Sequence, residues 1–327
     1  MALTRRELLA AVAAGAAGGV RAAAQSRGGG AAVRPTPIVC LYSRILAGKV
    51  DHIDLPMVVR GLGFDGCDLS VEPGGHVLPE KAGLFLMPAL EALTGAGLEV
   101  PVISTALTSA QGAAEEVLGL AHYIGVPLFR PGHWKVTGPA AVEARLPLVQ
   151  REIAGLGGLG RAANMAMAIH NFTGGPEGAS MADLTRVIRP FDPRWVGFDF
   201  DPGFAAAEGG PAGFAAALRL ALARLKMVSL RDFQWAPGGD GGNGGNGARK
   251  MTPCPLGEGV VDWPQFFTAL ARAGFAGPVS LQVDHQPKDE LSAIRRDLDF
   301  VRKQVAAAYA PAPAPAGGGR SPGAAAG

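Results

Sequence analysis

Aliphatic and polar residues alternate in several short runs along the chain, and the run at 279–284 is the clearest. Its residues are, in order, Val279, Ser280, Leu281, Gln282, Val283 and Asp284. Successive side chains of a strand point to opposite faces, so this run predicts a strand with one aliphatic face and one polar face. If the aliphatic face packs on helices, the polar face looks into a site that accepts hydroxyl, amide and carboxylate groups.

The segment before that strand has the start and stop signals of a helix. Asp262 suits the N-cap, Gln265 completes a capping box, and Pro264 lies in the first turn, where its missing N–H costs nothing. Apolar residues then recur at helical spacing as far as Gly274, a residue type that often closes helices in the left-handed conformation. The sequence therefore predicts a helix that starts at Asp262 and ends at Gly274.

The alternation of helix and strand extends over most of the chain. Strand-like runs occur at 38–42, 67–71, 100–104, 127–130, 165–170, 195–201, 227–232 and 279–284. Helical runs rich in Ala and Leu lie between them, for example at 84–96, 110–124, 140–154 and 212–225. Units of roughly thirty residues are typical of βαβ folds, and about eight such units in ~250 residues match a TIM barrel. We therefore predict a single (β/α)8 TIM barrel over 37–308, with a doubly wound open sheet as the alternative.

The polar positions of these strands share a phase. In the run 196–201, three bulky apolar residues alternate with Gly197, Asp199 and Asp201. The polar residues that fall near the carboxyl ends of the predicted strands are Glu72, His170, Asp201, Arg231 and Asp284. Active sites of (β/α)8 barrels are built at this face, so we expect these five side chains to cluster there.

Composition narrows the range of partners. The chain has 327 residues, 48% of them hydrophobic and 6% aromatic, with a formal net charge of +2. This balance lacks the one-sided basic field that binds phosphate backbones, and no stretch is long and apolar enough to span a bilayer. Nucleic acid and a membrane span are therefore not expected. The spacing of Cys40, Cys67 and Cys254 indicates neither a zinc motif nor a disulfide framework, so we interpret them as core or loop thiols.

The two ends of the chain differ from the middle. Arg5 and Arg6 precede an Ala- and Gly-rich apolar run, and small residues follow as far as Ala24. This is the order of regions in a twin-arginine export signal. We expect 1–24 to be a signal peptide cleaved after Ala24, which would make the protein periplasmic or secreted. Residues 25–36 have the composition of a linker, and 309–327 form a Pro-, Ala- and Gly-rich tail that cannot build a core.

Two glycine-rich segments need an interpretation. Residues 155–160 match G-x-G-x-x-G, but they follow a predicted helix and precede a strand, the reverse of the order that a dinucleotide requires. Residues 236–250 predict a flexible insert after the seventh strand, either a disordered segment or a lid.

A metal is one interpretation of the polar strand ends. His170, Asp201 and Asp284 could ligate a divalent ion, because imidazole with carboxylates suits Mn, Zn, Co or Mg. The alternative is a polar, water-filled barrel mouth without an ion. His76 and His133 lie on loops at the same face, where they could touch a ligand or a metal.

Four blocks of sequence, 63–76, 229–233, 255–262 and 277–281, resemble the sugar phosphate isomerase/epimerase family with its xylose isomerase-like TIM barrel. The most specific piece is Pro-Leu-Gly-Glu-Gly at 255–259. Members of that family hold a divalent metal with Glu, Asp, His and Glu at the ends of strands five to eight, and move protons or a hydride between adjacent sugar carbons. The resemblance implies a (β/α)8 barrel that acts on a small-molecule sugar.

The same resemblance places His170, Asp201 and Asp284 at the strand-five, strand-six and strand-eight ligand positions. Ser229 stands where the family has a strand-seven histidine, and Phe204 stands where relatives often have another. Because these changes shorten or delete ligands, the resemblance implies that the metal is weak, absent or shifted toward the residues His76, His133 and Glu72.

On this resemblance we expect an exported enzyme that isomerises or epimerises a free or oxidised sugar through an enediolate, or eliminates from a keto-sugar. Asp201, Asp284 and His170 would hold a metal or act as acid and base, and Arg231 or Lys135 would stabilise the oxyanion. Substrate contacts are expected from Glu72, His76, His133 and Trp134. The alternative is a catalytically silent carbohydrate-binding barrel, which Ser229 and Phe204 favour.

Overall fold

The computed structural model of the chain describes residues 35–134, 139–172, 179–236, 250–285 and 287–311. Eight parallel strands in these residues form a closed barrel in the order β1-β10-β7-β6-β5-β4-β3-β2. The strands are β1 (Ile38–Tyr42), β2 (Gly66–Val71), β3 (Glu99–Thr105), β4 (Leu128–Arg130), β5 (Ala166–His170), β6 (Val196–Phe200), β7 (Leu225–Leu230) and β10 (Pro278–Leu281). The predicted (β/α)8 barrel is thus confirmed, and the open-sheet alternative is wrong because β1 pairs with both β2 and β10.

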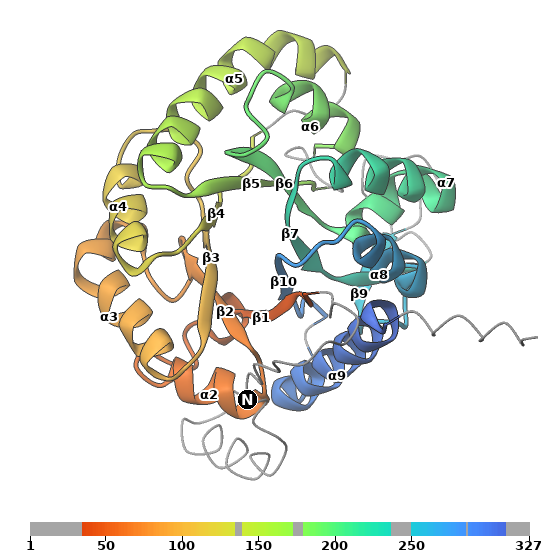
Figure 1. Cartoon of the computed structure of the whole chain (residues 1–327), viewed down its shortest axis with the longest axis horizontal. Helices are drawn as coiled ribbons and strands as arrows, with labels where there is room; N and C mark the ends of the chain where they lie inside the picture. The colour runs from red at the N-terminus through yellow and green to blue at the C-terminus, as the bar shows by residue number, and fades with distance from the viewer. Residues whose placement is uncertain (1–34, 135–138, 173–178, 237–249, 286, 312–327) are drawn as a thin grey trace, which may run out of the picture.

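Helices surround the barrel on its outside (Figure 1). They are α2 (Leu55–Leu62), α3 (Ala82–Gly95), α4 (Ala114–Ile124), α5 (Pro139–Ala162), α6 (Met181–Ile188), α7 (Pro202–Leu222), α8 (Trp263–Arg272) and α9 (Glu290–Tyr309). Two short 3-10 turns, η1 (Ser43–Leu46) and η2 (Pro79–Lys81), lie in loops. The helix expected from Asp262 is α8, whose N-cap carboxylate accepts a hydrogen bond from the Gln265 N–H at 3.0 Å.

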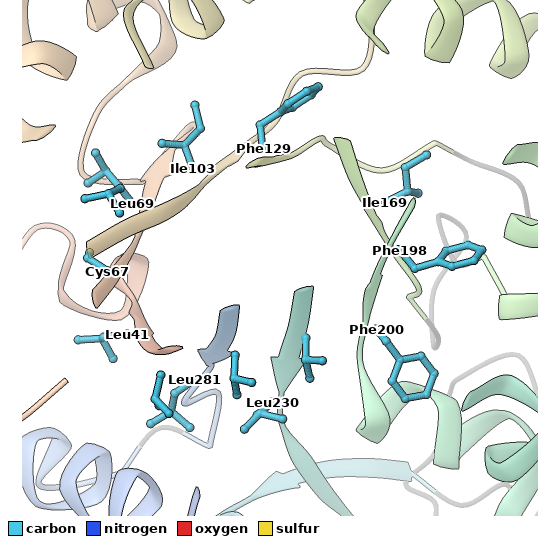
Figure 2. Packing of buried hydrophobic residues seen from close by; sticks show 14 of the residues in the cluster. Leu41, Cys67, Leu69, Ile103, Phe129, Ile169, Phe198, Phe200, Leu230 and Leu281 are labelled. Carbon is cyan, nitrogen blue, oxygen red and sulfur yellow. The ribbon is translucent and has the colours of Figure 1, made fainter. Parts of the chain in front are cut away.

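The predicted phase of the strands is confirmed. Bulky side chains such as Leu41, Leu69, Ile103, Phe198 and Leu281 point away from the barrel axis toward the helices (Figure 2). They belong to one large core cluster between strands and helices. The opposite faces hold a small separate cluster of Val102, Ala168 and Met227, together with buried Asp68, Asp199 and several serines. Apolar burial therefore holds the helices on the barrel, and the interior combines a small apolar cluster with polar groups.

Several predicted boundaries are corrected. The helix expected at 140–154 continues to Ala162, so the G-x-G-x-x-G segment lies inside α5 instead of after it. Glycine lets this helix lie close to the barrel, since a Cβ at Gly160 would come within 2.7 Å of the Phe129 ring. The helix expected at 212–225 starts earlier, at Pro202, because α7 continues across a kink at Gly209 and Gly210.

The strands after β6 end earlier than predicted. β7 ends at Leu230, and Asp232 begins an antiparallel hairpin of β8 (Asp232–Ala236) and β9 (Lys250–Cys254). β10 ends at Leu281, three residues before the predicted end. The hairpin arms flank the predicted glycine-rich insert, of which residues 237–249 lie outside the described residues.

The predicted signal peptide, most of the linker and the tail from 312 also lie outside the described residues. Within the described part of the chain, no helix is long and apolar enough to cross a membrane. The three cysteines are free: Cys40 and Cys67 are buried in or beside the barrel wall, and Cys254 is half-buried at the end of β9.

Candidate active site

Four of the predicted site residues lie at the carboxyl ends of neighbouring strands. His170 ends β5, Asp201 follows β6, Arg231 follows β7, and Asp284 lies three residues after β10. These strands are consecutive in the barrel, in the order β10-β7-β6-β5. The parallel arrangement therefore brings the four side chains to one sector of the barrel mouth, as the strand phase predicts.

Asp201 is the centre of this group. Its side chain is fully buried, and Oδ1 caps α7 by accepting a hydrogen bond from the Phe204 N–H at 3.0 Å. Oδ2 lies 2.6 Å from Arg231 Nε and 3.4 Å from His170 Nε2. Burial raises the pKa of the Asp201 carboxyl to about 7, although the charge of Arg231 opposes the rise. Asp201 can therefore both accept and release a proton near neutral pH.

Asn171 fixes the backbone of Asp201 from the neighbouring strand. The Asn171 side-chain oxygen accepts from the Asp201 N–H at 2.7 Å, and its Nδ2 donates to the Asp201 carbonyl oxygen at 3.1 Å. Both partners are buried. This two-point clamp fixes the backbone of Asp201 without using its carboxylate, so Oδ1 can cap α7 while Oδ2 faces Arg231 and His170.

Arg231 spans the distance between two carboxylates. Its Nε lies 2.6 Å from Asp201 Oδ2, and its Nη1 lies 3.1 Å from Asp284 Oδ2. The guanidinium carbon lies 4.6 Å above the centre of the Phe204 ring, within cation–π range. The Arg231 side chain is 17% exposed and that of Asp284 is 41% exposed, so the Asp284 side of the guanidinium faces the opening.

A hydrogen-bonded chain runs from Arg231 into the barrel. Arg231 Nη2 donates to Gln282 Oε1, and Gln282 Nε2 donates to Ser229 Oγ at 3.0 Å. Ser229 Oγ in turn donates to Asp199 Oδ2 at 2.7 Å. Burial raises the pKa of the Asp199 carboxyl to about 6, against the charge of Arg130, whose Nη1 lies 3.8 Å away. The Ser229 hydroxyl is thus hydrogen-bonded both to Asp199, inside the barrel, and to Gln282.

His170 connects Asp201 to the loop after β4. Its Nδ1 lies 3.2 Å from His133 Nε2, and its Nε2 faces Asp201. Burial, with the charges of Arg231 and Arg130 nearby, lowers the pKa of the His170 imidazole well below its usual value. The ring is therefore neutral at neutral pH and can donate from one nitrogen while it accepts at the other. Of the predicted substrate contacts, His133 is the one that the structure brings to this group.

The other predicted contacts lie elsewhere. Glu72 follows β2, across the barrel from β6, where it accepts from the Tyr42 hydroxyl and lies 3.1 Å from Arg44 Nη1. Trp134 is buried in the core, and its indole N–H donates to the Thr108 carbonyl oxygen at 3.1 Å, which gives it a packing role.

His76 and Lys135 complete the set of predicted residues. The ring of His76 is close to the 50–52 segment, and burial lowers its pKa to about 4. It therefore stays neutral and packs beside the β2 loop, away from the strand-six carboxylate. Lys135 lies outside the described residues.

A cavity of about 220 Å³ opens beside Arg231. Its lining includes Phe172, Gly203, Phe204, Arg231, Asp232, Phe233, Met251, Pro253 and Asp284. Pockets for drug-sized ligands measure about 300–1,000 Å³, so this cavity suits a smaller molecule. Its walls are aromatic and apolar, and charged groups meet it through Arg231 and Asp284. An aromatic wall with a cation and a carboxylate can hold a ring that has both C–H and hydroxyl surfaces.

The predicted metal set does not fit a divalent ion in this arrangement. Among the residues that the structure describes, no group of three or more His, Cys, Asp and Glu side chains is disposed to hold a metal. Asp201 and Asp284 both direct Oδ2 at the Arg231 guanidinium, a permanent cation. The Ser229 hydroxyl is occupied by Asp199 and Gln282. A metal at these oxygens would have to displace the arginine.

Several residues of the site were not among the sequence candidates. Gln282 belongs to the same alternation that points Ser280 and Asp284 inward, and this alternation could have identified it as a site residue. Asn171 directly follows His170, but nothing in its sequence context predicts that its amide binds the backbone of the next strand. Phe204 was noted as a departure from the family pattern, and the structure places it beneath the guanidinium of Arg231.

The Pro-Leu-Gly-Glu-Gly block has a structural role next to the site. The buried Asp232 carboxylate accepts from the N–H groups of Gly257 at 3.1 Å and Gly259 at 3.2 Å, and from Trp263 Nε1 at 2.8 Å. A Cβ at Gly259 would lie 2.0 Å from Asp232 Oδ1, so only glycine permits this close approach. The block therefore wraps around the first residue of β8 and fixes the loop that carries α8.

Comparisons with known proteins agree with this architecture. The family model for the xylose isomerase-like TIM barrel matches residues 56–304. A search of the curated proteins found no significant match. A xylose isomerase-like TIM barrel protein from Mycobacterium smegmatis, solved in complex with magnesium, is 16% identical with a TM-score of 0.64, over 84% of this chain and 98% of that one.

Two epimerases have the same fold. The 3-keto-D-glucoside 4-epimerase from E. coli is 15% identical with a TM-score of 0.60, over 82% of this chain and 99% of that one. D-Psicose 3-epimerase from Clostridium cellulolyticum, solved with D-tagatose, is 13% identical with a TM-score of 0.60, over the same shares of the two chains. At these identities the likeness concerns the fold. Because the family model covers most of the chain and the closed barrel agrees with it, the protein belongs to the xylose isomerase-like TIM barrel family.

Proposed function

We propose that this protein is a sugar isomerase or epimerase that moves a proton between a substrate carbon and Asp201 through an enediolate. One observation carries the proposal: a buried carboxyl with a pKa of about 7 lies 2.6 Å from a permanent cation at the mouth of the barrel. A base whose pKa is close to the working pH is effective in both directions of proton transfer. The fold shared with sugar epimerases supports a sugar as the substrate class.

Each side chain has a role in this reaction. The Asp201 carboxylate removes the proton on the carbon next to the carbonyl, and the electron pair of that C–H bond becomes the enediolate. The negative charge that develops on the carbonyl oxygen is stabilised by Arg231, which presents its Nη1 edge to the opening. The same proton, or one passed through the His170–His133 pair, then returns to a carbon of the enediolate. Asp284 is partly exposed, and a substrate hydroxyl can take its place on Arg231.

The size of the cavity and the predicted location of the protein narrow the range of candidate substrates. A volume of about 220 Å³ with Phe172, Phe204 and Phe233 in its walls suits one sugar ring whose C–H face packs on aromatic surface. We also propose export, on the basis of the twin arginines at 5 and 6. Phosphorylated sugars are scarce outside the cytoplasm, so free or oxidised sugars are the better candidates. No divalent metal is part of this proposal, because the guanidinium of Arg231 lies between the carboxylates that would hold it.

Exchange of a carbon-bound proton with solvent tests the proposal directly. Wild type would be incubated in D₂O with a panel of aldoses, ketoses and 3-keto-glycosides, and loss of C–H signals would be followed by NMR. Asp201→Asn keeps the shape and the α7 N-cap but removes the base, so exchange should disappear. Asp262→Asn makes the same change at the N-cap of α8, away from the site, and should leave exchange intact. Binding of a panel member without any exchange would instead show a carbohydrate-binding barrel without catalysis.

A further inference from the structure

We propose that Arg231 is a built-in cation that takes the place of a divalent metal, and that Gln282 and Ser229 hold it there. The catalytic consequence rests on the function proposed above. The binding consequence does not, because it concerns which cation the carboxylates of this site accept. The proposal reverses the expectation of a metal on His170, Asp201 and Asp284.

The guanidinium contacts three side chains from two segments of the chain, by charge at Asp201 and Asp284 and by a hydrogen bond at Gln282. Nε faces Asp201 at the start of α7, Nη1 faces Asp284 after β10, and Nη2 donates to Gln282, also after β10. Both carboxylates turn Oδ2 toward it. A divalent ion takes oxygen ligands in the same converging way, so the arginine head occupies the point on which these oxygens converge. The Phe204 ring closes the face of the guanidinium at 4.6 Å.

The side chains that replace the metal ligands of the family pattern are the ones that hold the arginine. Ser229 stands at the position where the pattern has a histidine, and its hydroxyl accepts from Gln282 Nε2. This bond turns the other end of the amide, Oε1, toward Arg231 Nη2. Phe204, at the second departure, lies under the same guanidinium. The Ser229 hydroxyl joins Asp199 to Gln282, and Gln282 in turn contacts Arg231, so the serine supports the position of the arginine.

Charge makes the two cations mutually exclusive. Arg231 cannot lose its proton in a protein, and its environment is largely buried, where like charges repel strongly. A divalent ion within reach of Asp201 and Asp284 would lie next to the guanidinium. The two carboxylates would then face three positive charges, and the arginine would lose its partners. The site therefore binds either the guanidinium or the metal, and the covalently attached cation has the higher local concentration.

The test measures metal in the full-length protein. Metal content of the purified wild type would be determined by mass spectrometry before and after EDTA, and Mn²⁺ binding would be titrated calorimetrically. Arg231→Met removes the charge and retains much of the side-chain length, and Arg231→Lys retains the charge. Arg194→Met removes an exposed arginine that pairs only locally with Asp192, and serves as the matched control.

We expect less than one tenth of an equivalent of divalent metal in wild type and no effect of EDTA on its thermal unfolding. Arg231→Met should bind Mn²⁺ at least about tenfold more tightly than wild type, whereas Arg231→Lys and Arg194→Met should stay like wild type. If Arg231→Met does not fold, the metal content of wild type and the effect of EDTA on its thermal unfolding still decide the matter. A stoichiometric, EDTA-sensitive metal in wild type would overturn the proposal. So would a folded Arg231→Met variant that binds Mn²⁺ no better than wild type.

These outcomes are separate from those of the exchange experiment. A wild type without metal that exchanges no sugar proton would leave the built-in cation intact and remove the isomerase. A metal-loaded wild type that exchanges protons would do the opposite.

Discussion

Asp232 should be a sensitive carboxylate for stability, because it lines the cavity and also holds the 255–261 loop beside it. Its side chain is 2% exposed. The carboxylate accepts from the backbone N–H groups of Gly257, Gly259 and Val261, and from the indole of Trp263 at 2.8 Å. We consider Asp232→Asn, which preserves the volume and replaces one oxygen with an NH₂ group.

The size of the effect follows from the donors that lose an acceptor. Oδ2 accepts three of these bonds, at 2.8, 3.1 and 3.2 Å. A hydrogen bond to a charged group contributes about 1.5–3 kcal/mol, and a buried donor left without a partner costs about 1–3 kcal/mol. In Asp232→Asn, the amide NH₂ takes the place of either Oδ2 or Oδ1. In both orientations it faces N–H donors that it cannot accept from, so two or more of these bonds are lost. Since such terms are not additive, we expect a loss of about 3–5 kcal/mol in the free energy of unfolding.

The assay is unfolding in urea and by heat, followed by circular dichroism. For a domain of this size 1 kcal/mol corresponds to about 2–4 °C in Tm, so the variant should melt about 6–20 °C below wild type. Glu258→Gln is the control, because Glu258 belongs to the same loop but is 56% exposed and pairs with Arg296 at the surface. Exposed pairs contribute about 0–1 kcal/mol. If Asp232→Asn changes the free energy of unfolding by no more than Glu258→Gln does, the carboxylate does not organise this loop.

Two further predictions concern proton binding and export. Burial raises the Asp201 pKa to about 7 in the folded protein, whereas an unfolded Asp has a pKa near ~3.9. The folded state thus retains a proton that the unfolded state releases, so this stability is fully present below pH ~4 and is lost as pH rises through about 7. Urea unfolding at several pH values should show wild type losing about 4 kcal/mol relative to Asp201→Asn over this window, and parallel profiles would contradict the raised pKa. Replacement of Arg5 and Arg6 by lysine should leave the precursor in the cytoplasm, as detected by fractionation and immunoblotting; unchanged export would reject the twin-arginine interpretation.

The barrel itself was predictable because its strands alternate so regularly. Inward residues such as Asp68, Asp199 and Ser280 are polar, while their outward neighbours are aliphatic or aromatic, and a period of two leaves little choice of register. The predicted ends of the strands were less accurate. Arg231 and Asp232 continue the alternation beyond β7 without continuing its pairing, because Asp232 turns to the Pro-Leu-Gly-Glu-Gly loop instead. Periodicity reports the direction of a side chain and says little about the hydrogen bonds of its backbone.

The composition of the site was predictable, and its connections were not. Strand phase brings His170, Asp201, Arg231 and Asp284 to one rim. It does not determine that the arginine side chain reaches back between the two carboxylates, since that depends on the rotamer of a long, flexible residue and on Gln282. His76 and Trp134 show the opposite error. Each lies on a loop near the predicted face, but the Trp134 ring is buried in the core and the His76 ring lies beside the 50–52 segment.

The carboxylates at the end of β6 show why this barrel needs its arginines. Asp199 lies in β6 and Asp201 follows it two residues later, so both point inward. Burial raises the pKa of each carboxyl, and the charge of Asp199 adds to the rise at Asp201. Arg130, at the end of β4, lies 3.8 Å from Asp199, and Arg231 lies 2.6 Å from Asp201. Each carboxylate thus has its own guanidinium, one on either side of β6. The hydroxyl of Ser229 and the amide of Gln282 join the two pairs into one chain, from Asp199 to Arg231. Removal of Arg231 alone therefore leaves the Asp199–Arg130 pair in place. Under that condition a metal could bind at Asp201 without unfolding the barrel.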